Sequence, residues 1–267
     1  MSTKGQIRPS VLITGCGKGG IGHALALEFK HQGYVVYTTL LAHEPRDHLT
    51  DLGIHAFTAD VTKDTDVEQL KDTISSLTED SLNVLVNNAG ICYTMTAIDT
   101  DVREVEKMFG VNVFGPMRMV HFFHPLLIKA KGKIVNIGSV GGIVPYIYGS
   151  SYNATKAALH HWGNTLRVEM KPFGVDVINI ISGEIGTNIL KRDNNRKLPE
   201  NSFYRPLEEE FANHVNRTPH TTTPAEYAKS VVSEVMKKNP SAWFWTGATT
   251  GIDWIFTRQF NLNKLSM

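Results

Sequence analysis

The chain has 267 residues, of which 42% are hydrophobic and 20% charged, a composition typical of globular proteins that excludes a disordered chain. Its formal net charge is +1, so no overall charge attracts it to nucleic acid or anionic lipid. Two cysteines and 11 histidines show neither a disulfide framework nor a metal-ligand spacing. The polar start MSTKGQIRPS lacks the apolar segment of a signal peptide. We therefore expect a cytoplasmic protein that binds neither nucleic acid nor metal.

Short apolar runs alternate with amphipathic stretches of helical length, the pattern of βαβ units on a parallel sheet. The predicted strands are Val11–Thr14, Val35–Thr38, Ala56–Ala59, Val84–Asn87, Lys133–Ile137 and Asp176–Ile181. The predicted helices are Ile21–Gln32, Asp64–Ser76, Asp101–Leu127 and Ser151–Met170. No linker or internal repeat interrupts the order, so the predicted fold is α/β: one domain over residues 1–267, with a three-layered, doubly wound parallel sheet.

The C-terminal third departs from this pattern. Gly186–Thr223 is polar, contains three prolines and has no clean periodicity, which predicts a loop or lid. We assign residues 10–187 to the core, 188–223 to a substrate lid and 224–267 to a helix, strand and tail. The tail AWFWTGATTGIDWIFTRQF is too interrupted for a transmembrane span and predicts a final strand and helix packed on the body. The alternative is an apolar patch that faces a second subunit or makes weak peripheral contact with intracellular membranes or lipid droplets.

A glycine-rich loop connects the first predicted strand to the first predicted helix. Its sequence is GCGKGGIG, and it contains Gly15, Lys18, Gly20, Ile21 and Gly22. Glycines allow a tight turn and close backbone approach, and the helix start favours a pyrophosphate. A Walker A loop requires Gly-Lys-Ser or Gly-Lys-Thr, which is absent. The loop therefore predicts a dinucleotide site.

The choice of dinucleotide depends on the end of the second strand. Thr39 and its neighbours there are not acidic, whereas Lys18 and Arg46 supply positive charge. Glu44 precedes Pro45 and is assigned to the next segment. These features favour NADP(H) over NAD(H). Further cofactor contacts are expected where the third and fourth strands end, at Asp60, Val61, Asn88, Ala89 and Gly90.

Three polar residues at the same predicted sheet edge form a candidate catalytic set. Tyr152 and Lys156 are four residues apart and share one helix face. A phenol has a pKa near 10, so it needs a neighbouring cation to act near pH 7, and Lys156 supplies one. Ser139 follows a strand and is placed to meet Tyr152 and a substrate oxygen. Tyr146 and Tyr148 have no lysine four residues later.

Together these motifs resemble the short-chain dehydrogenase/reductase family, whose fold is Rossmann-type. TGxxxxGIG, NNAG, the asparagine of GVNVFG, Ser139 and Tyr152-x-x-x-Lys156 follow in the family's order over residues 10–190. The resemblance implies that Tyr152 is the general acid/base and that Ser139 orients the carbonyl or alcohol. It also implies that Lys156 binds the ribose and lowers the tyrosine pKa, and that Asn112 holds a water in a proton relay. A homodimer or homotetramer through Asp101–Leu127 and Ser151–Met170 is likewise implied.

The sequence departs from the family pattern at two places. The glycine loop is one residue longer than usual, and Ser182-Gly183 replaces the usual Pro-Gly, which leaves Ile185 and Thr187 as contacts of the nicotinamide carboxamide. The longer loop, with EMKPFGVDVIN and KAKGKIVNIGS, resembles a fungal branch that includes 1-acyldihydroxyacetone-phosphate reductases and ketoreductases of secondary metabolism.

The expected function is an NADPH-dependent interconversion of a ketone and a secondary alcohol on a largely apolar small molecule. The sequence is also compatible with two alternatives: a redox-neutral isomerase, dehydratase or cyclase, and a non-catalytic NADP-binding module. The lid combines aromatic and basic residues, which suits an apolar substrate with an acidic or phenolic group, although a solvated loop is an equally good interpretation. These residues are Phe203, Tyr204, Phe211, Lys191, Arg192, Arg196, Lys197 and Arg205.

Overall fold

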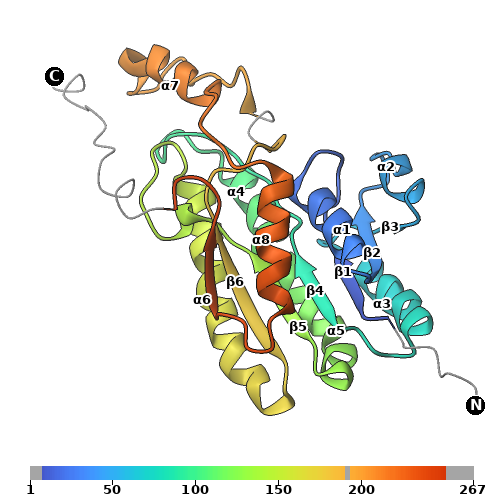
Figure 1. The fold of residues 1–267 in the computed structure, drawn as a ribbon. Coiled ribbons are helices and arrows are strands. Elements are labelled where there is room, and N and C mark those ends of the chain that lie inside the picture. Colours follow the sequence, from blue (N-terminus) through green and yellow to red (C-terminus); the bar gives the residue numbers. More distant parts are fainter. Residues whose placement is uncertain (1–7, 190–192, 251–267) are drawn as a thin grey trace, which may run out of the picture.

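The computed structural model describes residues 8–189 and 193–250. These residues form one seven-stranded sheet of order β3-β2-β1-β4-β5-β6-β7, in which every pair of neighbouring strands is parallel (Figure 1). The strands are β1 (Ser10–Ile13), β2 (Val35–Leu40), β3 (His55–Thr58), β4 (Val84–Asn87), β5 (Lys133–Ile137), β6 (Asp176–Ser182) and β7 (Trp243–Thr246). All six strands predicted between the N-terminus and the lid are present, and the predicted last strand corresponds to β7. The fold is a single Rossmann-type domain, as expected.

Helices cover both faces of the sheet (Figure 1). Helices α1 (Ile21–His31) and α8 (Pro224–Met236) pack together on one face, and they share a buried core with β1 and β2. Helices α3 (Asp64–Thr78), α5 (Gly115–Ala130) and α6 (Ser150–Met170) bury their apolar sides on the other face. Because β1 and β4 are fully buried on both faces, their sequences SVLI and VLVN are almost continuously apolar.

The predicted helix over residues 101–127 is divided into three parts. Helix α4 (Val102–Phe109) leads into a π-helical turn at Gly110–Phe114, and α5 then continues to Ala130. A π turn inserts an extra residue into the helical repeat, so the apolar pattern remains nearly continuous across it. Such insertions are frequent at functional sites, and this one contains the buried Asn112.

The lid region is more ordered than its composition predicted. Helix α7 (Glu208–Val215) lies beyond the carboxyl ends of the strands, apart from both helical layers (Figure 1). Only Phe211 and Val215 of this short helix are buried, which is too few for a recognisable periodicity. A 3₁₀ turn at Arg205–Leu207 also lies in the lid, and outside it further short helical pieces are α2 (Asp47–Thr50) and the 3₁₀ turns at Val140–Gly142 and Lys171–Phe173.

The described residues contain no helix that is long and apolar enough to cross a membrane. Of the aromatic tail, Trp243 and Trp245 belong to β7, and Trp245 is 40% exposed. The predicted final helix, and the part after residue 250 of the alternative patch that faces lipid or a second subunit, lie outside the described residues.

Three buried asparagines hold α6 against the sheet. The Asn87 side-chain amide donates to Asn136 Oδ1 at 2.9 Å, and Asn136 donates to Asn179 Oδ1 at 3.1 Å, so the ladder crosses β4, β5 and β6. Asn179 then donates to the backbone carbonyl of His160 in α6 at 3.1 Å. A Cβ on Gly163 would lie 2.3 Å from Asn179 Oδ1, so only glycine allows the helix to approach this closely.

We expect Gly163→Ala to destabilise the protein by about 1–3 kcal/mol, because the added methyl group forces α6 away from the amide ladder. The gain in helix propensity offsets only about 1 kcal/mol of this effect. Urea unfolding of both proteins measures the difference. The control is Ala157→Gly on the exposed side of α6, where about 1 kcal/mol is lost through propensity alone. A Gly163→Ala protein as stable as the parent would contradict the packing argument.

Candidate active site

A cavity of about 810 Å³ runs along the carboxyl ends of the strands, the edge where open parallel sheets bind ligands. Nearly all of the predicted cofactor and catalytic residues line this cavity. These are Gly15, Lys18, Gly20, Ile21, Thr39, Asp60, Val61, Asn88, Ala89, Gly90, Ser139, Tyr152, Lys156, Ile185 and Thr187. Gly22 and Asn112 are the two predicted site residues that do not line it. Within the described residues, no cluster of three or more His, Cys, Asp or Glu is arranged to hold a metal.

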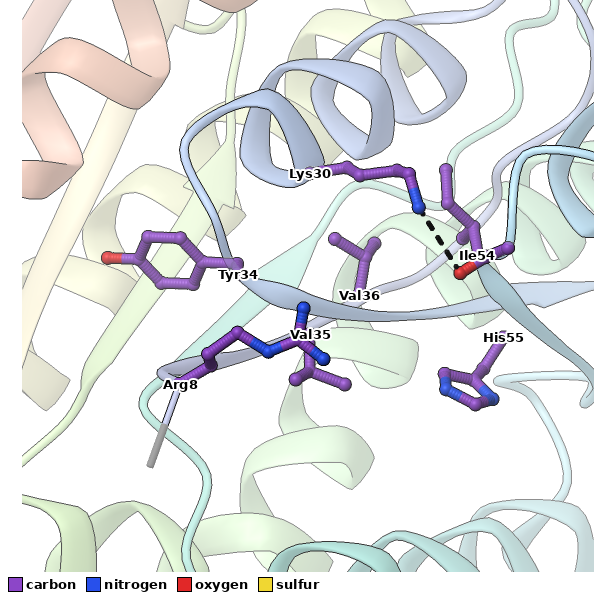
Figure 2. Close-up of a pocket in the computed structure, with 8 residues that line it drawn as sticks. Arg8, Lys30, Tyr34, Val35, Val36, Ile54 and His55 are labelled. Atoms are coloured by element: carbon purple, nitrogen blue, oxygen red, sulfur yellow. Dashed lines mark hydrogen bonds between the residues drawn. The ribbon is translucent and has the colours of Figure 1, made fainter. Parts of the chain in front are cut away.

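A second cavity of about 290 Å³ lies at the amino ends of β2 and β3 (Figure 2). Arg8, Lys30, Tyr34 and His55 line it, and the Lys30 ammonium donates to the Gly53 carbonyl at 3.5 Å. In a parallel sheet this is the edge opposite Tyr152. The candidate active site is therefore the larger cavity.

Two glycines of the glycine loop are required by close packing against the loop that contains NNAG. Gly15 has φ +70°, and a Cβ there would lie 2.7 Å from Ala89 Cα. A Cβ on Gly22 would lie 2.5 Å from both Asn88 Nδ2 and the Gly15 carbonyl. Gly22 is thus needed for packing of α1 against the NNAG loop, and its direct contact with the cofactor stays a prediction.

Asn88 connects the glycine loop to the NNAG loop through hydrogen bonds. Its side-chain amide donates to the carbonyls of Thr14 and Gly15, both at 2.8 Å. In return, Thr14 Oγ1 accepts from the backbone N–H groups of Asn88 and Ala89 at 3.0 Å. Helix α1 begins directly after the glycine loop without a side-chain cap, so its first N–H groups face the cavity. This arrangement fits the pyrophosphate of a dinucleotide.

The end of the cavity near Thr39, after the second strand, differs from the prediction in two respects. Glu44 folds back to accept a hydrogen bond from the Leu41 N–H at 2.8 Å, and it lines the cavity rather than starting the next segment. Arg46 instead binds Thr58 on β3, so it does not line the cavity. Lys18 lines the cavity, as does His43. The charge at this end therefore comes from Lys18 opposed by Glu44.

Tyr152 and Lys156 lie on the first turns of α6 and face the same cavity. The Lys156 ammonium lies 5.7 Å from the centre of the Tyr152 ring and donates to the Ile137 carbonyl at 2.9 Å. Burial raises the pKa of the Tyr152 phenol, and its hydrogen bond with Ser139 partly opposes this effect. Burial lowers the pKa of Lys156 to about 8. The phenol therefore retains its proton at neutral pH.

Asn112 connects the π turn to two neighbouring segments. Its side chain makes two hydrogen bonds of 2.9 Å with the backbone of Ile91, accepting from the N–H and donating to the carbonyl. It also donates to Thr155 Oγ1 at 3.1 Å. Asn112 Oδ1 and Lys156 Nζ would lie 3.4 and 3.9 Å from a Cβ on Gly90, so both approach that glycine. Its side chain thus has a positioning contact that the family resemblance did not imply.

Two residues near the catalytic set were not predicted. Cys92 follows the NNAG loop, and burial raises the pKa of its thiol to about 11. The thiol lies close enough to affect the pKa values of Tyr152 and Lys156. His160 accepts the backbone N–H of Ser139 at 3.2 Å. In the sequence, only the spacing of four residues between Lys156 and His160 could have indicated this role. Many helical residues share that spacing, so it is a weak signal.

Two basic residues of the lid, Arg196 and Arg205, are paired with acidic residues of the lid. Arg196 donates to the buried Asp193 at 2.9 and 2.5 Å and stacks on Tyr93, while Arg205 pairs with Glu208. These pairs leave the predicted acidic group of the substrate without support from the two arginines. Lys191 and Arg192 lie outside the described residues.

The aromatic lid residues have different environments. Phe211 is fully buried against Tyr148, with their ring centres 5.0 Å apart, and Tyr204 packs at the edge of the same cluster. Phe203 is 76% exposed. The same apolar cluster also includes Met95 and Met108, and Tyr152 packs against it, so one side of Tyr152 has apolar surroundings.

Comparisons with known proteins agree with this geometry. A family model described as short chain dehydrogenase matches residues 9–198. Short-chain dehydrogenase AnuB of Penicillium roqueforti is 76% identical over 261 residues, which cover 96% of this chain and 91% of that protein. The NADPH-dependent 1-acyldihydroxyacetone phosphate reductase of Schizosaccharomyces pombe is 39% identical over 230 residues, which cover 85% and 78% of the two chains.

A solved structure extends the likeness to three dimensions. The crystal structure of a short-chain dehydrogenase from Streptomyces avermitilis matches with a TM-score of 0.77 and 26% sequence identity, and the match covers 93% of this chain and 90% of that one. The chain therefore belongs to the short-chain dehydrogenase/reductase family of oxidoreductases and lies in a branch that it shares with fungal enzymes.

Proposed function

We propose that the protein is an NADPH-dependent reductase that converts a ketone on a small, largely apolar molecule to a secondary alcohol. The main support for this proposal is that Ser139, Tyr152 and Lys156 line the same cavity as the glycine loop. A cofactor-binding module without turnover has no need for a buried phenol beside a lysine and a serine hydroxyl.

The residues of this chain have distinct roles in the proposed reaction. When bound, the reduced nicotinamide supplies a hydride to the carbonyl carbon. Tyr152 holds a proton at neutral pH and donates it to the carbonyl oxygen, while the Ser139 hydroxyl donates a hydrogen bond to the same oxygen. The Lys156 ammonium stabilises the phenolate that remains. We assign a water near Asn112 and Lys156 to the relay that returns the proton, because both side chains approach Gly90.

The surroundings of Tyr152 support an apolar substrate. Tyr93, Met95, Tyr148 and Phe211 belong to the cluster against which Tyr152 packs. A predicted homo-oligomer through α4, α5 and α6 is supported by exposed apolar side chains on these helices and the turn between them: Val102, Phe114 and Val168. The oligomeric state and the cytoplasmic location stay predictions.

The preference for NADPH is proposed to depend on Lys18. The related reductase of Schizosaccharomyces pombe is named as NADPH-dependent, and Lys18 lines the cavity at the end where a 2′-phosphate is expected. We expect Lys18→Ala to weaken NADPH binding about tenfold, which equals about 1.4 kcal/mol, and to leave NADH binding unchanged. Calorimetric titration of both cofactors measures this difference. Lys30→Ala, at the opposite edge of the sheet, is the control (Figure 2). Equal weakening of both cofactors by Lys18→Ala would contradict the assignment.

Replacing the catalytic phenol tests the reductase function. A panel of ketones and aldehydes with NADPH or NADH, and of secondary alcohols with NADP⁺ or NAD⁺, first identifies a substrate of the parent protein. We expect Tyr152→Phe to lower kcat with that substrate by at least about 100-fold, because the proton donor is lost, with the Kd for NADPH unchanged. Tyr34→Phe removes a phenol far from the site and serves as control (Figure 2). Full activity of Tyr152→Phe would overturn the proposed mechanism.

The two pKa shifts predict how the rate of reduction depends on pH. The raised pKa of Tyr152 keeps the phenol protonated at neutral pH, and Lys156, with a pKa of about 8, is still charged there. Raising the pH first removes the lysine charge and then the tyrosine proton, and both losses oppose proton donation. We expect kcat for reduction to be constant at neutral pH and to fall above about pH 8. A rate of reduction that rises with alkaline pH would contradict these roles.

A further inference from the structure

His160 is a buried imidazole that lies directly beneath the turn containing Ser139. It is 2% exposed and occupies α6 one turn after Lys156. A Cβ on Gly138 would lie 2.1 Å from His160 Nε2, and a Cβ on Gly142 would lie 2.8 Å from Nδ1. The ring therefore fits only because glycines stand on both sides of the segment that begins with Ser139.

The imidazole serves this segment as a hydrogen-bond acceptor. The Ser139 N–H donates to His160 Nε2 at 3.2 Å, which requires a neutral ring that carries its proton on Nδ1. Burial and the nearby charge of Lys156 lower the pKa of His160 to about 4, so the ring is neutral under ordinary conditions. Trp243 packs on its other side, with ring centres 5.5 Å apart.

The other ring nitrogen of His160, Nδ1, does not explain why a histidine occupies this position. Nδ1 is buried and has no hydrogen-bond partner among the described residues. An apolar side chain of similar size would avoid leaving this N–H unpaired. The Nε2 contact with Ser139 is therefore the interaction that distinguishes histidine from leucine here.

The contact connects the Ser139 turn to the helix segment that is bonded to the asparagine ladder. The backbone carbonyl of His160 accepts from Asn179, the end of the asparagine ladder. Within the turn, Ser139 Oγ accepts from the Gly141 N–H at 3.1 Å, and the Ser139 carbonyl accepts from the Gly142 N–H at 2.9 Å. The Ser139 hydroxyl proton is left to face the Tyr152 phenol, with which Ser139 is hydrogen-bonded, and its direction depends on the backbone that His160 holds.

We propose that His160 is a positioning residue that fixes the backbone of Ser139 and so directs its hydroxyl toward the carbonyl oxygen that Tyr152 protonates. This inference rests on the proposed reductase function for its kinetic consequence. The hydrogen bond itself can be tested without any substrate.

Two variants at this position separate the hydrogen bond from packing. The Oε1 atom of the glutamine in His160→Gln can accept the Ser139 N–H from a position close to that of Nε2, whereas His160→Leu fills the space without an acceptor. His161→Leu, on the exposed side of the same helix, is the matched control.

The structural experiment is NMR of isotope-labelled protein. We expect the ¹⁵N shifts of His160 at pH 7 to show the neutral form protonated on Nδ1. The Ser139 amide should exchange with deuterium at least tenfold faster in His160→Leu than in the parent, and His160→Gln should restore most of the protection. A charged ring, or unchanged exchange in His160→Leu, would overturn the proposed contact.

The kinetic experiment uses NADPH and the best carbonyl from the panel. We expect His160→Leu to lower kcat by about 10- to 100-fold, because a misplaced oxyanion donor stabilises the transition state less. The Kd for NADPH should not change, His160→Gln should recover most of the activity, and His161→Leu should match the parent. An unchanged kcat in His160→Leu, or equal losses in the leucine and glutamine variants, would overturn the positioning role. A parent protein that reduces no carbonyl would instead overturn the reductase proposal itself.

Discussion

The docking of helix α6 on the buried asparagine ladder determines the positions of Tyr152 and Lys156 and of the His160 ring that contacts Ser139. Buried amides are costly unless they are hydrogen-bonded, and here the three amides bond to one another across three strands and finally to the helix backbone. A slip of one residue in any strand would turn its asparagine to the other face. The ladder therefore fixes both the register of β4, β5 and β6 and the depth at which α6 lies.

From this anchored helix, three side chains one turn apart extend toward the strand ends. Tyr152 and Lys156 reach the cavity, while His160 stays beneath the Ser139 turn. On the cofactor side, Asn88 performs a similar task by holding the glycine loop against the loop after β4. Both halves of the site thus depend on buried amides that join loops from strands distant in sequence.

Much of this architecture was predictable because it depends on local patterns. Buried parallel strands require apolar, branched residues, and a glycine-rich loop between a strand and a helix is typical of a nucleotide site. The π turn around Asn112 was missed because one extra residue barely changes an apolar repeat. The cavity position of Glu44 depends on a single hydrogen bond to Leu41, and the pairing of Arg196 with Asp193 depends on how the lid folds. Neither contact leaves a periodic signal, and the role of His160 becomes apparent only when Ser139 is brought beside it.

The central claim is that the cavity at the carboxyl edge supports net reduction of a carbonyl, and isotope transfer tests it most directly. NADPH deuterated at the transferable position of nicotinamide C4 is incubated with the protein and its best carbonyl substrate, and the product is examined by mass spectrometry. The account predicts one deuterium on the carbinol carbon for each NADPH oxidised. A product that forms without deuterium and without net NADPH oxidation would contradict it and would instead identify a redox-neutral reaction on the same scaffold.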